Sequence, residues 1–507
     1  MWPIPLTDRL APGWWLSPLL VLPWLNFYTA GPTANTWPWL LSALCALLLW
    51  LGRRRLNGEL IATTWVLAAS LSALIALIQY FGWAHALHPW VSQTGAGEAF
   101  ANLRQRNQFA TLTSIGLVAL IALRAWQAPA QPVSWLAGLA LMLLALGNAA
   151  SGSRTGLLQW IVIALLSAWW FWPQQRRLLV FALQALLAYG LAVYTVPWLL
   201  EGMTGTHSGG LFSRLVTSVG CSSREILWFN VLTLIAQKPW LGWGWGELDY
   251  AHFVTLYPGE RFCEILDNAH NLPLHLAVEL GLPAALAICT AVVWLVWNGR
   301  PWRETDPLRQ MAWGVLAVIG LHSLLEYPLW YGPFQLAAGL CVGLLGTRGC
   351  HRRTTGVIGK PTSWMAWSAV RVVQWLMVLT LGGALTVMAL SYRQVSQIYL
   401  LPADRSAAYS DDTLKKVRGN WLFHSEARFA ELSMTSLVPG NAAWVHAMAL
   451  ELLHYSPEPR VIEKLIESAV MLGHEEEAEY YLIRYRAAFP AEHARWAKEN
   501  ASGASRG

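Results

Sequence analysis

The amino-acid sequence predicts an all-α polytopic membrane protein that ends in a soluble helical domain. Hydrophobic residues make up 55% of its 507 residues and charged residues only 13%, whereas soluble domains carry about 25% charge. Apolar runs of about 20 residues, the length that crosses a bilayer, recur along residues 1–392. The 32 tryptophans suit a chain with two membrane interfaces, where indole rings settle at headgroup level. These features exclude a soluble enzyme, a disulfide-rich secreted module and a disordered chain.

We expect about 11 transmembrane helices, within a range of about 10 to 12. They follow the apolar runs at 14–30, 37–51, 60–81, 109–126, 133–150, 157–172, 178–200, 279–297, 311–325, 328–347 and 367–391.

Loop arginines predict the orientation of these spans. Clusters at 53–55, 176–177, 300–309 and 348–360 all follow even-numbered runs, and the positive-inside rule places such loops, and with them the N-terminus, in the cytoplasm. The far side then holds the segments 82–108, 151–156, 201–278 and everything after Tyr392. In a multi-pass protein of the bacterial inner membrane, that side is the periplasm.

The chain therefore divides into a transmembrane domain, 1–392, with a large periplasmic loop at 201–278, and a periplasmic helical domain, 393–507. Residues 1–392 hold 22 basic and 14 acidic side chains, whereas residues 393–507 hold 13 basic and 15 acidic side chains. No basic stretch is interleaved with aromatics, so nucleic acid is not an expected partner. Four helices are expected in the C-terminal domain, at 425–437, 441–454, 459–472 and 475–489, as a tetratricopeptide-like hairpin array. A scaffold or docking surface is the favoured role of this array.

Several arginines lie on the side where membrane insertion does not require them. Arg154 occupies a very short link, 151–156, between two spans; a guanidinium at that depth should face a cavity and an anionic partner. Arginine binds phosphate through a rigid bidentate fork. A pyrophosphate clamp is the resulting hypothesis, and ordinary loop solubility is its alternative. The candidates for the clamp are Arg154, Arg224, Arg214, Arg104 and Arg106.

The segment 104–108, Arg-Gln-Arg-Asn-Gln, directly precedes an apolar span. Its two cations and three amides, Asn107 among them, suit polyphosphate or sugar hydroxyls. A polar cap with snorkelling arginines explains the same residues, so both readings stay open.

The long loop holds two further features. Residues 226–237 form an amphipathic stretch that we expect to lie on the membrane surface. The glycine–tryptophan alternation at 241–246 follows; no Lys-Ser/Thr ends it, so it is not a phosphate-binding loop. Its indoles, Trp243 and Trp245, are candidates to contact a lipid or a sugar ring.

His270 is the candidate general base, because a histidine titrates near neutrality and can accept a proton from an attacking hydroxyl. Asn271 beside it and Glu279 further on are supporting candidates. A hydrogen-bonded interfacial histidine is the alternative. His322 and Glu326, four residues apart at the outer end of another span, are functional candidates because ionisable residues in membranes are costly.

Neither a metal nor a cofactor is expected, because the outward acidic residues are scattered and no metal-ligand spacing occurs. Cys221 and Cys263 share the periplasmic loop, an oxidising compartment, and we predict a disulfide between them.

Four segments together resemble a known family. They are 102–110 (NLRQRNQFA), 153–156 (SRTG), 223–224 with 239–244 (SR, PWLGWG) and 269–271 with 279–281 (AHN, ELG). In this order and on one predicted side of the membrane, they resemble the O-antigen ligase/polymerase superfamily of lipid-linked glycan transferases. The Arg-Gln-Arg-Asn segment, the EYPL element at 326–329 and the helical tail resemble its protein O-oligosaccharyltransferase branch.

The resemblance implies metal-independent transfer of a whole glycan from undecaprenyl pyrophosphate on the periplasmic face. By this likeness His270 is the catalytic base or orients the acceptor, and Arg154 and Arg224 hold the pyrophosphate, with Arg214, Arg104 and Arg106 as further candidates. The expected acceptor is a serine or threonine of a pilin-like protein. Lipid A core, as in O-antigen ligases, and a growing O-antigen chain are the alternatives.

A transporter or flippase of lipid-linked sugars is the rival from another class. Transporters usually show two related halves; the sequence has no internal repeat and carries one large one-sided loop.

Overall fold

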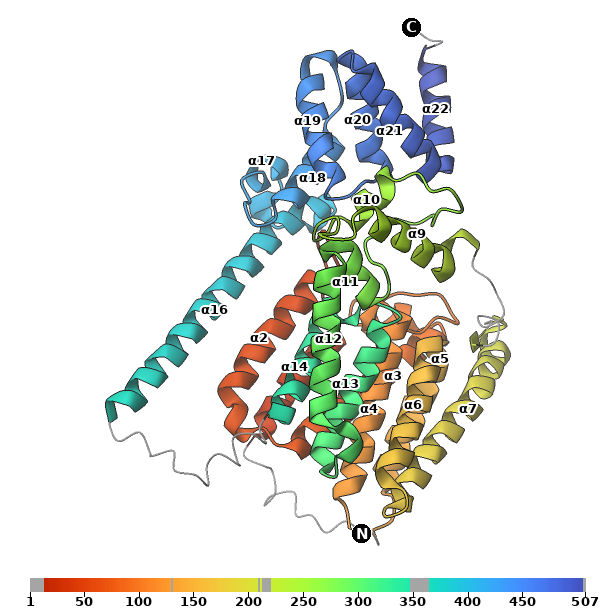
Figure 1. The fold of residues 1–507 in the computed structure, drawn as a ribbon, viewed down its shortest axis with the longest axis vertical. Helices are drawn as coiled ribbons and strands as arrows, with labels where there is room; N and C mark the ends of the chain where they lie inside the picture. The colour runs from red at the N-terminus through yellow and green to blue at the C-terminus, as the bar shows by residue number, and fades with distance from the viewer. Residues whose placement is uncertain (1–12, 129–130, 208–209, 212–219, 347–363, 505–507) are drawn as a thin grey trace. The chain divides into compact units, whose positions relative to one another are not determined.

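The computed structural model describes residues 13–128, 131–207, 210–211, 220–346 and 364–504 (Figure 1), and the secondary structure in these ranges is helical. Two compact units divide the chain. Unit 1 comprises residues 1–29, 33–217 and 296–389, and unit 2 comprises residues 30–32, 218–295 and 390–507. The expected division at residue 392 assigned the long loop to the membrane domain; by its contacts, most of that loop belongs with the C-terminal helices.

Unit 1 is a helical bundle around α4 (Arg106–Trp126). Helices α3 (Gly58–Tyr80), α5 (Trp135–Ser151), α6 (Arg154–Phe171) and α13 (Pro307–Ser323) all pack against it. Further out lie α1 (Ser17–Leu25), α2 (Thr36–Gly52), α7 (Arg176–Thr204) and α14 (Gly332–Gly346). Because α4 is the most enclosed of the long apolar helices, the residues at its ends are held by neighbours on several sides.

Seven helices in the described ranges are long and apolar enough to cross a membrane, and three shorter apolar helices accompany them. The long ones run Thr36–Arg55, Gly58–Tyr80, Arg106–Trp126, Arg154–Phe171, Arg176–Thr204, Leu282–Arg303 and Val372–Tyr399. The short ones are Trp14–Leu25, Trp135–Ser151 and Gly332–Gly346. The chain is thus consistent with a polytopic membrane protein, and each of the 11 expected apolar runs contains a helix. The number of true spans stays a prediction.

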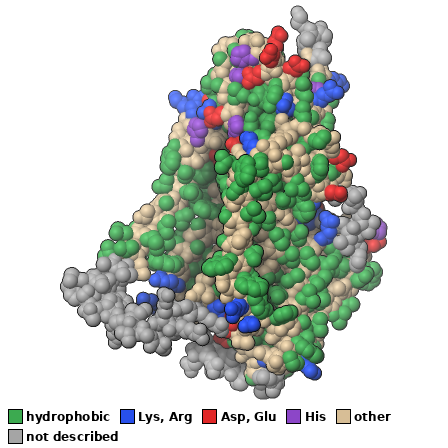
Figure 2. Space-filling view, viewed as in Figure 1, with side chains coloured by type: hydrophobic (Ala, Val, Ile, Leu, Met, Phe, Trp, Pro, Cys, Tyr) green, Lys and Arg blue, Asp and Glu red, His purple; other side chains and the backbone are tan. Residues whose placement is uncertain are grey.

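Exposed apolar side chains cover the outer helices. Leu379 on α16 (Trp364–Tyr399) and Trp294 on α12 (Leu282–Gly299) are 68% and 62% exposed, and hydrophobic side chains cover much of the visible face over these helices (Figure 2). In water such surfaces would aggregate, whereas in a bilayer they face lipid tails.

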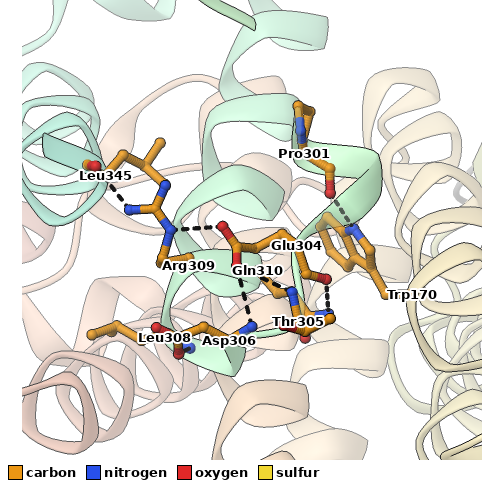
Figure 3. A network of polar contacts seen from close by, with 9 residues as sticks. All are labelled: Trp170, Pro301, Glu304, Thr305, Asp306, Leu308, Arg309, Gln310 and Leu345. Carbon is orange, nitrogen blue, oxygen red and sulfur yellow. Dashed lines mark hydrogen bonds and ion pairs between the residues drawn. The ribbon is translucent and has the colours of Figure 1, made fainter. Parts of the chain in front are cut away.

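A polar network closes the turn between α12 and α13 within unit 1 (Figure 3). Buried Glu304 pairs with Arg309 at 2.6 Å, and Arg309 also donates to the Leu345 carbonyl of α14 at 2.8 Å. The Trp170 indole of α6 donates to the Pro301 carbonyl at 2.8 Å. A buried cation is tolerated only when paired and hydrogen-bonded. Here Arg309 joins α13 to α14, and the separate Trp170 hydrogen bond joins α6 to the turn before α13.

The loop part of unit 2 folds around its own apolar core. Helix α9 (Arg224–Gln237), α10 (Leu248–Val254) and α11 (Leu272–Leu280) contribute its buried residues. Cys221 and Cys263 are joined by the expected disulfide. The predicted amphipathic helix exists as α9, but one face is buried in this core, and exposed Phe229 and Leu232 lie on the other side.

The C-terminal part of unit 2 contains the four expected helices and one more. They are α18 (His424–Met434), α19 (Ala442–Leu453), α20 (Pro459–Met471), α21 (Glu475–Ala488) and α22 (Pro490–Ala504), preceded by the short α17 (Thr413–Val417). Helices α19, α20 and α21 lie side by side (Figure 1) and share one apolar core with Phe253 of α10. The tetratricopeptide-like class stays a prediction.

The glycine–tryptophan segment packs against the junction of α11 and α12. Trp243 N–H donates to the Val278 carbonyl at 2.8 Å and Gly244 N–H to the Glu279 carbonyl at 3.0 Å. A Cβ on Gly242 would overlap the Glu279 carbonyl, and a Cβ on Gly281 would overlap the Trp240 carbonyl. These two glycines therefore allow two backbones to touch, which is one of the uses of glycine in proteins.

We predict that Gly281→Ala destabilises unit 2 more than Gly246→Ala. Both glycines have a φ near +80°, but only Gly281 faces a neighbouring backbone, and Gly246 has no atom near its Cβ position. The positive φ alone costs alanine about 1–3 kcal/mol, and the overlap at Gly281 adds about 1–3 kcal/mol. Thermal unfolding of the two purified variants measures the difference. Equal unfolding midpoints would contradict the close approach.

Candidate functional site

Three of the predicted clamp arginines occupy the same kind of position, the first residue of a helix. Arg106 opens α4, Arg154 opens α6 and Arg224 opens α9, after the capping residues Gln105, Ser153 and Ser223. The positive end of the helix dipole lies there, so a cation is unfavourable unless an anion is also bound. Helix N-termini with added cations are suited to bind phosphate.

A hydrogen-bonded chain links α4, α6 and the segment after α13 in unit 1. The Ser153 hydroxyl donates to Asn107 Oδ1 at 2.6 Å, and Asn107 Nδ2 donates to Glu326 Oε1 at 3.1 Å. The same hydroxyl accepts the Gly156 N–H at 3.1 Å and so caps α6. This chain holds the two helix N-termini that carry Arg106 and Arg154 next to one carboxylate.

A second set of polar contacts lies deeper in the bundle. His322 Nδ1 and Thr111 Oγ1 are hydrogen-bonded at 2.9 Å, and Gln159 Nε2 donates to the same threonine oxygen at 2.8 Å. Gln159 Oε1 accepts the Ser114 hydroxyl at 3.0 Å. All four side chains are buried, so His322 does not point to solvent. It is hydrogen-bonded to Thr111 of α4, which is in turn hydrogen-bonded to Gln159 of α6.

The arginines of unit 1 differ in their partners. Arg106 pairs with Glu98 at 2.6 Å, so its charge is already matched in this structure. Arg154 is exposed, and no acidic side chain among the described residues pairs with it. It is the better candidate for an external anion.

Arg104 lines a cleft of about 390 Å³ in unit 1. Its backbone is left-handed, with a φ of 60°, between a short 3-10 turn and α4. Buried Asn102 supports this turn by donating to the carbonyls of Leu25 and Trp90, both at 2.8 Å. His88 and Gln93 line the same cleft. The lining residues offer Arg104 and neutral polar groups without an acidic residue, which suits an anionic or sugar ligand.

His270 belongs to unit 2 and lies between two anchored neighbours. The Trp228 indole of α9 donates to the Ala269 carbonyl at 3.1 Å, and Asn268 Oδ1 accepts the His270 N–H at 2.9 Å. Asn271 caps α11 by accepting the Leu274 N–H at 3.1 Å. The backbone of His270 is left-handed, with a φ of 49°, a conformation that non-glycine residues adopt sparingly and that clusters at functional sites.

His275 and Glu279 form a buried pair behind His270. Their Nε2 and Oε2 atoms lie 3.4 Å apart, and Glu279 Oε1 accepts the Gly246 N–H at 3.1 Å. Burial, together with the charge of His270, lowers the pKa of His275 to about 4. Burial also raises the pKa of Glu279 to about 7. At neutral pH the histidine is therefore uncharged, and the pair is a polar contact, not an ion pair.

The remaining predicted residues have more limited roles in the structure. The Trp243 indole donates to the Leu234 carbonyl of α9 at 3.0 Å, and Lys238 lies 3.9 Å above its ring, so Trp243 is engaged in packing. Trp245 is 63% exposed, with its ring 6.4 Å from that of His275. Arg214 lies outside the described residues.

The predicted residues that the structure describes divide between the two units. Unit 1 holds Arg104, Arg106, Asn107, Arg154, His322 and Glu326, and unit 2 holds Arg224, Trp243, Trp245, His270, Asn271 and Glu279. The sequence predicted no role for the linking residues, namely Ser153, Thr111, Gln159, Glu98 and Trp228, although Ser153 lies in the 153–156 motif. Ser153 had a sequence signal, because a serine directly before an apolar run is a typical helix N-cap.

Comparisons with known proteins match most of the chain in parts. Residues 137–289 match the family model described as O-antigen ligase, and residues 310–502 match virulence factor membrane-bound polymerase, C-terminal. Residues 99–123 match the model described as protein glycosylation ligase. The protein glycosylation ligase match contains Arg104, Arg106 and Asn107, and the O-antigen ligase match contains Arg154, Arg224 and His270.

Three curated relatives are similar over part of their length. A general O-oligosaccharyltransferase of Acinetobacter baylyi is 26% identical over 55% of this chain and 48% of its own. A ComP-specific O-oligosaccharyltransferase of the same species is 28% identical over a match that covers 58% of this chain and 53% of the relative. An O-antigen ligase of Pseudomonas aeruginosa is 28% identical over a match that covers 46% of this chain and 48% of the relative. The chain thus spans about half the length of the curated relatives it matches, and the resemblance expected from the motifs is confirmed.

The buried Glu279 predicts a specific pH dependence of stability. Its folded-state pKa of about 7 exceeds the ordinary value of 4.5, so its contribution to stability is present at low pH and is lost as pH rises through about 7. Between pH 6 and pH 8.5 the free energy of unfolding of the wild type should fall by about 1.4 kcal/mol relative to that of Glu279→Gln, whose side chain cannot ionise. Thermal unfolding of both proteins across this pH range measures the difference. Parallel pH profiles of the two proteins would show that Glu279 ionises normally.

Proposed function

We propose that this chain transfers a glycan as a whole from undecaprenyl pyrophosphate to an acceptor hydroxyl on the periplasmic face of the bacterial inner membrane. The observation that carries the proposal is the placement of Arg154 and Arg224 at the first residues of α6 and α9. The O-antigen ligase model matches the region that holds both arginines and His270. Helix N-termini with added guanidinium groups are the arrangement that a pyrophosphate needs.

The proposed reaction uses one base and several fixed cations. His270 accepts the proton of the acceptor hydroxyl, whose oxygen attacks the anomeric carbon of the donor glycan. The new glycosidic bond forms as the bond from that carbon to the phosphate oxygen breaks, and undecaprenyl pyrophosphate leaves with the bonding electrons. Arg154 and Arg224 stabilise the negative charge that builds on the leaving group. No metal or cofactor is needed for this balance of atoms and charges.

The other predicted residues support this chemistry in the proposal. Asn107, with Ser153 and Glu326, holds the start of α6, and His322 fixes α13 against α4. Arg104 in its cleft is a second candidate to contact the donor. Arg106, which Glu98 neutralises, is assigned a positioning role.

A serine or threonine of a pilin-like protein is the proposed acceptor. Two of the three relatives are named as O-oligosaccharyltransferases. The third is named as an O-antigen ligase, which keeps lipid A core as the second candidate, and polymerisation of O-antigen is the third. Transport of lipid-linked sugars, the alternative from another class, has no support among these matches.

His270→Ala should lower transfer by about 10²–10⁴-fold, the usual contribution of a general base. The assay combines the purified protein, a lipid-linked glycan and either a pilin-like protein or lipid A core, with mass spectrometry of the acceptor. His207→Ala removes an exposed histidine of the same predicted loop and should leave transfer unchanged. If the wild type modifies neither acceptor, the enzyme proposal fails.

Arg154→Ala and Arg224→Ala should each lower transfer by at least about tenfold while the proteins express normally, because removing one donor to a developing anion commonly costs more than that. Arg154→Lys keeps the charge but loses the bidentate fork, so it should recover only part of the rate. Arg303→Ala, in a predicted cytoplasmic turn, is the matched control and should be fully active. Wild-type rates in both alanine variants would eliminate the clamp.

A further inference from the structure

Three potential metal ligands meet within the C-terminal helices of unit 2. His446 lies on α19, His474 in the turn between α20 and α21, and Glu477 in the first turn of α21. Their ligand atoms all lie within 4.8 Å of one another. No other group of three such side chains meets this criterion in the described part of the chain.

The carboxylate of Glu477 already faces both imidazoles. Its Oε2 atom lies 3.1 Å from His446 Nε2 and 3.4 Å from His474 Nδ1. In a tetrahedral zinc site with bonds of about 2.0–2.1 Å, neighbouring ligand atoms lie about 3.3 Å apart. Two of the three distances between ligand atoms therefore already agree with the spacing around a bound ion. The ligand nitrogens of the two imidazoles need to approach each other by at most about 1.5 Å.

The backbone around these ligands is well anchored. Gly473, two residues after the end of α20 at Met471, has a φ of 77°, and the His474 N–H donates to the Ala469 carbonyl at 2.9 Å. This is the six-to-one hydrogen bond of a helix C-terminal motif. The His446 side chain is 11% exposed and that of His474 is 52% exposed. One ligand is thus rigid and enclosed, whereas the other can rotate to complete the site.

We propose that His446, His474 and Glu477 bind a divalent transition-metal ion, with Zn²⁺ as the best fit. Two imidazole nitrogens and one carboxylate oxygen form a known zinc ligand set that leaves a fourth position open. The bound ion connects α19 to α21 across α20 and stabilises the C-terminal array. This site is distinct from His270, so metal-independent transfer and a metal in the C-terminal helices are compatible.

Zinc titration of the full-length protein tests the proposal. The protein is purified in detergent with a histidine-free tag, and isothermal titration calorimetry with Zn²⁺ should show one site in the wild type. His446→Ala, His474→Ala and Glu477→Gln should each weaken that site by at least tenfold. Zn²⁺ should also raise the thermal unfolding midpoint of the wild type, but not that of His474→Ala.

His424→Ala is the matched control, because His424 faces Glu451 at 4.0 Å elsewhere in the same helices. It should bind Zn²⁺ as the wild type does. His474 is exposed, so its replacement keeps the fold and tests the site even where His446→Ala unfolds. Absence of a zinc site in the wild type, or equal affinity in the wild type and His474→Ala, would overturn the proposal. Neither result depends on glycan transfer.

Discussion

The hydrogen-bonded chain from Ser153 through Asn107 to Glu326 is the interaction on which the candidate site of unit 1 depends. Polar side chains inside an apolar bundle must satisfy one another, because neither lipid nor an apolar core can. Here that requirement joins the N-terminus of α4 to the N-terminus of α6. As a result, Arg154 is presented at a helix start whose dipole and charge both favour an anion.

In unit 2, close contact between backbones holds the candidate site residues in place. Gly242 and Gly281 let the segment after α9 touch the α11–α12 junction, and the Trp228 indole holds the peptide just before His270. The left-handed backbone of His270 is supported by these neighbours. These contacts fix the main chain from which the candidate base projects.

Much of the helical organisation could be predicted from the sequence, because apolar runs and Gly/Pro breaks determine where helices form and end. The Cys221–Cys263 pairing followed from the predicted sidedness. The glycine–tryptophan segment was expected to contact substrate, yet Trp243 packs against α9; glycines that permit ligand approach and glycines that permit backbone contact look alike in sequence. The meeting of His446, His474 and Glu477 was also missed, since it depends on how α19, α20 and α21 pack.

In the proposed mechanism, outward arginines bind the pyrophosphate of the donor while His270 acts on the acceptor. Direct binding of undecaprenyl pyrophosphate to the protein in nanodiscs, without any acceptor, separates these roles. His270→Ala should bind the lipid with the wild-type Kd, whereas Arg154→Ala should bind it at least tenfold more weakly. Equal binding by Arg154→Ala and the wild type would rule out Arg154 as a ligand of the pyrophosphate.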